Sequence, residues 1–92
     1  MGLLDLFLKK AYDLGKAKDM KSDARFYRCE PPMEGNDFVV VSATDTLGGP
    51  ETYAFPSNEL GEVTDWSELD CSRRGDWTHE EILYEAGYKV VE

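Results

Sequence analysis

The strongest β-strand signal in this 92-residue sequence is the run Phe38-Val39-Val40-Val41-Ser42-Ala43-Thr44. β-Branched and aromatic side chains, which favour strands, occupy most of its positions. Its first half is apolar at consecutive positions, and such a run is typical of a strand whose two faces are both buried. We therefore predict that residues 38–44 form a central strand with a helix covering one side.

The segment before this run is predicted to be its antiparallel neighbour. Residues 25–30 read as a strand, and the polar residues 34–37 form a turn between the two strands. Proline cannot donate a hydrogen bond to a neighbouring strand. Pro31 and Pro32 are therefore expected to end the first strand.

The segment after the run is predicted to return as the second strand of a hairpin. Residues 47–50 contain two glycines and a proline, which is typical of a turn. Residues 51–55 then form the return strand, which Pro56 is expected to stop. Residues 57–77 are predicted to be a turn followed by a loop or a short helical turn, with a short fourth strand at 62–64 as an option.

The C-terminal part of the chain carries clear helix signals. Thr78 precedes Glu81 by three residues, which is the spacing of a capping box. Gly87 stands where a helix often ends in a left-handed conformation. We predict a helix over residues 79–86 and a final strand over residues 88–91 that returns to the sheet.

The N-terminal part has apolar residues at helical spacing, with charged residues largely on the other face. These apolar residues are Leu3, Leu4, Phe7, Leu8, Ala11, Tyr12 and Leu14. The pattern predicts an amphipathic helix from about residue 3 to residues 14–21. We expect its apolar face to be formed by Leu4, Phe7, Leu8 and Ala11.

Taken together, these elements predict an α+β fold. It would consist of a small antiparallel sheet of three to five strands, an N-terminal amphipathic helix and a short C-terminal helix. Residues 1–22 would be the basic helix and residues 23–92 an acidic β-rich body, within one compact domain.

The charges are distributed unevenly along the chain, whose formal net charge is -9. Residues 1–28 carry a net charge of +3, from seven basic and four acidic residues, whereas residues 29–92 carry -12, from three and fifteen. Between Arg28 and Arg73 there are ten acidic residues and no basic one. Such a body is unsuited to direct binding of nucleic acid, which requires a cationic surface.

The acidic body therefore predicts a non-catalytic interaction protein that binds a basic protein surface. One possible partner is a nucleic-acid-binding protein, whose binding surface the chain would occupy by mimicking phosphate charge. The chain would then act as an inhibitor, by analogy with small acidic inhibitors of bacteriophages. Improved solubility is the simpler explanation of the same charge. The predicted binding surface consists of Glu34, Asp37, Asp45, Glu51, Glu59, Glu62, Asp65, Glu68 and Asp70.

Two alternatives come from other classes of protein. The N-terminal helix would dock on an anionic membrane or in a partner's groove, or bury its apolar face in a homodimer instead of covering the sheet. A small enzyme would have to use Asp65, Glu68, Asp70 and His79, but no spacing among them matches a known catalytic arrangement. We therefore expect no catalytic residues.

No cofactor, metal ion or secretion signal is expected from the sequence. The chain lacks the paired Cys-x-x-Cys ligands of structural zinc sites and the calcium-loop pattern. Cys29 and Cys71 are too few for a disulfide-stabilised secreted scaffold, and we expect them to be free thiols in the cytoplasm.

Overall fold

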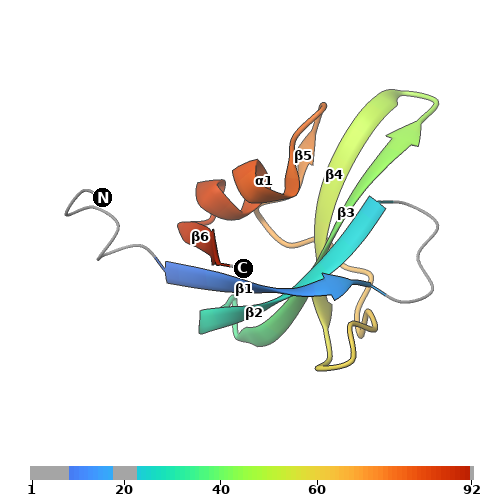
Figure 1. Ribbon diagram of the computed structural model, residues 1–92. Coiled ribbons are helices and arrows are strands. Elements are labelled where there is room, and N and C mark those ends of the chain that lie inside the picture. Colours follow the sequence, from blue (N-terminus) through green and yellow to red (C-terminus); the bar gives the residue numbers. More distant parts are fainter. Residues whose placement is uncertain (1–8, 18–22, 92) are drawn as a thin grey trace.

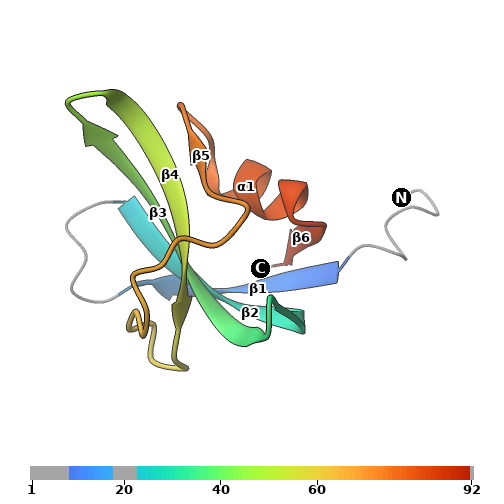
Figure 2. The ribbon, with the colours of Figure 1, turned by 180° about the vertical axis from the view of Figure 1, so that it is seen from behind.

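The chain forms one strongly curled sheet with a single described helix in its hollow (Figure 1). This computed structural model describes residues 9–17 and 23–91. The sheet has the strand order β5-β4-β3-β2-β1-β6, and Figure 2 shows its curvature from behind. Its elements are β1 (Lys9–Lys16), β2 (Asp23–Met33), β3 (Asn36–Thr46), β4 (Gly49–Ser57), β5 (Arg73–Arg74), α1 (His79–Glu85) and β6 (Tyr88–Val91).

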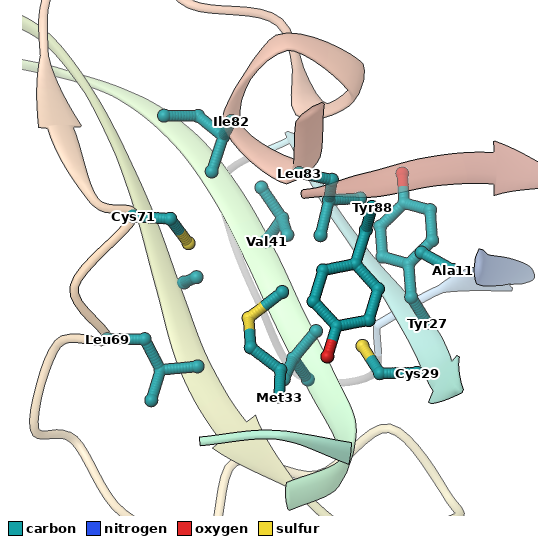
Figure 3. Packing of buried hydrophobic residues seen from close by; sticks show 12 residues of the cluster. Ala11, Tyr27, Cys29, Met33, Val41, Leu69, Cys71, Ile82, Leu83 and Tyr88 are labelled. Atoms are coloured by element: carbon teal, nitrogen blue, oxygen red, sulfur yellow. The ribbon is translucent and has the colours of Figure 1, made fainter. Parts of the chain in front are cut away.

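Strand β3 is central, as predicted, and it is buried on both faces. Val39, Val40 and Val41 are each 0% exposed. Successive side chains of a strand point to opposite faces. Val39 and Val41 accordingly join the inner cluster that contains Ile82 and Leu83 of α1 (Figure 3), whereas Val40 lies on the outer face.

The two predicted hairpins are present, but prolines do not end their strands. β2 continues through Pro31 and Pro32 to Met33, and β4 continues through Pro56 to Ser57. The pairing of β2 with β3 is interrupted between Arg28 and Met33, so these prolines lie where the regular ladder is already broken. At such an irregular position no backbone N–H is needed for pairing between the strands, so proline is tolerated there.

The predicted C-terminal helix and strand are confirmed. The Thr78 side chain accepts a hydrogen bond from the Glu81 N–H, and the Glu81 carboxylate accepts one from the Thr78 N–H. Gly87 has a φ of 90°, and its N–H donates to the Tyr84 carbonyl at 2.8 Å. The chain then enters β6, which pairs in parallel with β1.

The predicted α+β fold class is wrong, because the described part of the chain is mostly β. Residues 9–16, predicted to be helical, form β1 between β2 and β6. Ala11, assigned to the apolar face of the helix, is fully buried in the inner cluster of the sheet. The rest of that face, Leu4, Phe7 and Leu8, lies outside the described residues.

The surroundings of β1 explain why its sequence does not alternate between apolar and polar residues as a strand usually does. Ala11 points into the core, whereas Tyr12 lies on the outer face beneath the Arg28 guanidinium, 4.4 Å from the ring centroid. Both faces of β1 therefore accept apolar side chains, so alternation is lost. A bulge between Asp13 and Gly15 shifts the register as well. Pairing with two strands outweighs the weak intrinsic preference for a helix.

The loop after β4 covers part of the outer face and brings a glycine against an aromatic ring. Gly61 has a φ of 81°, and a Cβ atom at this position would lie 2.8 Å from the Phe26 ring. Gly35 has a nearly identical φ of 84° but no atom within 4 Å of its Cβ position. Substitutions at Gly35 and Gly61 therefore share the backbone strain, and only a substitution at Gly61 adds a steric clash.

We expect Gly61→Ala to destabilise the protein more than Gly35→Ala. Both substitutions place a side chain in the left-handed region, at a cost of about 1–2 kcal/mol. Gly61→Ala also displaces Phe26, which adds about 1–3 kcal/mol. Urea unfolding of both variants measures the difference, and equal losses of stability would show that the loop does not pack on Phe26.

Candidate functional site

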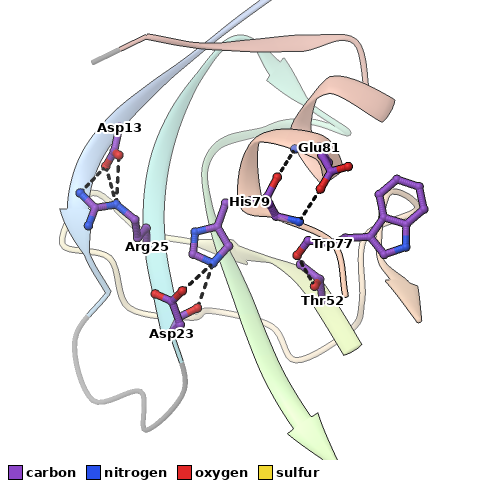
Figure 4. Close-up of polar contacts among 8 residues, drawn as sticks. Asp13, Asp23, Arg25, Thr52, Trp77, His79 and Glu81 are labelled. Atoms are coloured by element: carbon purple, nitrogen blue, oxygen red, sulfur yellow. Dashed lines mark hydrogen bonds and ion pairs between the residues drawn. The ribbon is translucent and has the colours of Figure 1, made fainter. Parts of the chain in front are cut away.

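A cleft opens between the first turn of α1 and the neighbouring parts of β1 and β2. Its volume is about 590 Å³. The residues that line it include Tyr27 and four residues that Figure 4 labels, which are Asp13, Asp23, Arg25 and His79. The cleft lies on the concave side of the sheet, in a position comparable to the mouth of a barrel, which is a common place for ligands.

A bidentate ion pair joins β1 to β2 at one wall of the cleft. The Arg25 Nε lies 3.1 and 3.0 Å from the two Asp13 carboxylate oxygens, and Nη2 lies 3.0 Å from Oδ1. The Gly15 N–H also donates to Asp13 Oδ1, at 2.9 Å. Burial acts to raise the pKa of Asp13, but the hydrogen bonds and charge of Arg25, with the Gly15 hydrogen bond, lower it below its usual value.

His79 connects the helix to the beginning of β2. Its Nε2 lies 2.9 Å from the Asp23 carbonyl oxygen and 4.0 Å from the Asp23 carboxylate. A carbonyl oxygen only accepts hydrogen bonds, so Nε2 carries a proton and donates it to this carbonyl. The His79 side chain is only 10% exposed.

Seven of the nine predicted acidic residues are exposed and lie on two neighbouring segments, the β2–β3 turn and the loop that follows β4. Glu34 and Asp37 flank the β2–β3 turn, and Phe38 faces Ser57, where the loop after β4 begins. A hydrogen bond from the Asp70 N–H to the Glu34 carboxylate, at 3.0 Å, ties this loop to the turn. We name this group the acidic end; it consists of Glu34, Asp37, Glu59, Glu62, Asp65, Glu68 and Asp70.

The remaining two predicted acidic residues lie elsewhere. Asp45 and Glu51 are beside the β3–β4 hairpin turn, at the upper right in Figure 1. Asp45 is seven residues along β3 from Phe38, a distance of about 23 Å at the usual rise of a strand. The structure therefore brings seven of the nine predicted residues together and separates two.

No carboxylate of the acidic end forms an ion pair with any residue in the described ranges. Arg73 follows the loop closely, but its guanidinium donates to the backbone carbonyls of Asp70 and Ser72. Asp65 accepts a hydrogen bond from the Ser67 N–H, which lowers the pKa of this carboxyl. Lys9 and Arg73 line a pocket together with Glu34 and Asp70, but neither forms an ion pair with a carboxylate of the acidic end.

Two large apolar side chains are exposed within the acidic end. Trp66 is 65% exposed, although one edge of its ring contacts Phe55 with 5.2 Å between centroids, and Leu60 is 54% exposed. From the sequence, Leu60 was expected in a turn and Trp66 in a loop or a short helical turn, and neither was predicted to be a surface group. Their exposure adds an apolar component to the acidic surface.

The four residues considered for catalysis do not come together. Asp65, Glu68 and Asp70 belong to the loop at the acidic end, whereas His79 lies in the cleft beside Asp23. Within residues 9–17 and 23–91, no three His, Cys, Asp or Glu side chains are arranged to hold a metal ion.

The two cysteines are buried free thiols. Figure 3 shows Met33 among the side chains between Cys29 and Cys71. Burial raises the pKa of Cys29 to about 12 and that of Cys71 to about 11. Thiols that stay protonated at neutral pH are poor nucleophiles and poor metal ligands.

Comparisons with protein families, curated proteins and solved structures found no match to this chain. In the part of the chain that the structure describes, no helix has the length and apolar character needed to cross a membrane. Any functional conclusion therefore depends on the geometry and charges of the surface.

The Asp13–Arg25 pair predicts a specific pH dependence. We expect Asp13→Asn to lower the melting temperature by several degrees at neutral pH, because it breaks the bidentate pair. The pKa of Asp13 is lowered by folding, so its contribution is full above the unfolded pKa of about 3.9 and disappears as the pH falls through the folded pKa.

Thermal melts of wild type and variant from neutral to strongly acidic pH measure this effect, with Asp45→Asn as the control. The gap between wild type and Asp13→Asn should close in acid. A gap that stays constant across the whole pH range would contradict a charge-dependent role for Asp13.

Proposed function

We propose that this protein is a non-catalytic interaction protein of the cytoplasm whose acidic end binds a basic protein surface. The observation that supports this proposal is a group of seven exposed carboxylates without an ion pair among the described residues. Two buried free thiols are in keeping with a reducing compartment.

The arrangement of charge favours binding over solubility alone. Like charges held near one another oppose folding, and dispersed charges would keep the protein soluble with less repulsion. A cationic partner would remove this repulsion and add attraction. The carboxylates therefore gain their favourable contacts in a complex and not within the free chain.

The exposed apolar residues favour a protein as the partner. Trp66 and Leu60 offer exposed apolar area in the same loop as these carboxylates, and tryptophan is among the residues that contribute most to protein interfaces. Small dissolved cations would neutralise the carboxylates but would not cover this apolar area. A basic protein surface with an apolar patch matches both components.

A nucleic-acid-binding protein is the class of partner that fits best. Its binding surface is already adapted to a dense row of negative charges. Exposed carboxylates of the acidic end would occupy the positions of phosphates, so the chain would act as an inhibitor of nucleic-acid binding. This step rests on charge complementarity.

The proposal is tested by affinity capture at low ionic strength, with mass spectrometry of the captured proteins. We expect basic proteins that are released by rising salt, because surface charge interactions are screened within about 10 Å at 0.1 M salt. Duplex DNA added in excess should also release them if they are held through their nucleic-acid-binding surface.

Charge reversal provides the matched comparison. Glu59→Lys with Glu68→Lys should weaken binding of the captured partner by about tenfold or more, whereas Asp45→Lys with Glu51→Lys, equal in charge but distant, should have a much smaller effect. Capture of acidic proteins, retention in high salt or equal effects of the two variants would contradict the proposal.

A further inference from the structure

The cleft at α1 is separate from the acidic end, and it has features that the proposed function does not use. Asp23 at its rim faces Ala43 on β3, whereas the loop of the acidic end begins opposite Phe38. The two surfaces therefore lie toward opposite ends of the same strand. The residues that line the cleft come from β1, β2, β3 and β6, from the first turn of α1 and from residues 76–78 just before this helix.

The hydroxyl of Tyr27 has no hydrogen-bond partner among the described residues, although the residue is only 2% exposed. Every fully buried side-chain nitrogen or oxygen in the described ranges does have a partner. The Tyr27 hydroxyl must therefore reach the space of the cleft that this residue lines. A nearly buried hydroxyl that faces a cleft without a protein partner is suited to a ligand.

The charges around this hydroxyl are predominantly negative. Asp13 is neutralised by its bidentate pair with Arg25. Asp23, Asp76 and Glu80 also line the cleft and add three negative charges, whereas Arg25 is the one Lys or Arg side chain among the lining residues. The cleft therefore presents acceptors to a cationic donor.

The size and lining of the cleft favour an organic cation over a metal ion. Within the described ranges, its carboxylates are not gathered closely enough to ligate a metal. A volume of about 590 Å³ is in the range of small-molecule sites. Trp77 and Val90 supply apolar lining for a hydrocarbon chain, and an aromatic ring also attracts cations.

We infer that this cleft binds the primary ammonium group of an alkylamine, with the Tyr27 hydroxyl and the carboxylates of Asp76 and Glu80 as its recognition groups. An ammonium group has three donors, which matches an acceptor-rich site. The same group occurs in free amines and in lysine side chains, so both sources satisfy the chemistry.

The test is an amide NMR titration of the full chain at constant ionic strength. The probes are 1,4-diaminobutane and the peptide Gly-Lys-Gly, with butyrate as the anionic control. We expect saturable shifts of the Tyr27 and His79 amides with at least one amine probe and none with butyrate. Response to the diamine alone indicates a free amine, and response to the peptide alone indicates a lysine side chain.

Three variants identify the recognition groups. Tyr27→Phe removes only the hydroxyl and should weaken binding about three- to tenfold. It should leave the melting temperature of the free protein unchanged or raised, because the hydroxyl has no partner to lose. Asp76→Asn with Glu80→Gln should weaken binding about tenfold, whereas Glu59→Gln with Glu68→Gln, equal in charge and outside the cleft, should change it less than about twofold.

Several results would overturn the inference. They are an absence of saturable cleft shifts with both amine probes, wild-type affinity in Tyr27→Phe, a lower melting temperature of free Tyr27→Phe, or equal weakening by the two charge-neutralised pairs. Shifts of the same size at the acidic end and in the cleft would show non-specific cation binding and would also overturn it.

Discussion

Burial of β3 on both of its faces is the constraint on which the rest of the structure depends. Its inner valines need a cover, which α1 supplies through Ile82 and Leu83, and Val40 needs a cover on the outer face, beside which Phe26 and Phe55 lie in register. The sheet meets the first requirement by curling around the helix, and the loop after β4 covers part of the outer face. The curl brings β1 and β6 to one side of α1 and the segment of residues 69–74 to the other, so that one seven-residue helix suffices to fill the hollow.

The same constraint determines where the surface groups lie. Antiparallel pairing of β2, β3 and β4 places the β2–β3 turn beside the loop that leaves β4, and this proximity assembles the acidic end from two distant parts of the sequence. At the other end of β3, the curled sheet does not close against α1, which leaves the cleft with Tyr27 at its wall. Two surfaces with different chemistry thus follow from a single curled sheet, and neither surface contains the helix that the N-terminal pattern suggested.

Much of this fold could be predicted from local signals. The valine run of β3, the capping box at Thr78 and Gly87 have strong local physical causes, and each was predicted correctly. β1 could not be recognised, because its extended conformation depends on pairing with β2 and β6, and its bulge removes the alternation of a strand. The cleft was missed for a related reason: Tyr27 and His79 are 52 positions apart, and only the curl of the sheet brings them to one space. The nine acidic residues could be identified from the sequence. The strand register was needed to show that seven of them lie near the β2–β3 turn and two beside the β3–β4 turn.

The central claim is that the carboxylates of the acidic end do not serve folding and are kept for a cationic partner. Urea unfolding of Glu59→Gln with Glu68→Gln at low ionic strength tests it most directly, because these two side chains make no hydrogen bond or ion pair within the described ranges. The variant should be more stable than wild type, by more than the matched Asp45→Asn with Glu51→Gln variant, and the gain should shrink in molar salt as repulsion is screened. A variant that is less stable than wild type would show that these carboxylates hold the fold together, which would contradict the claim.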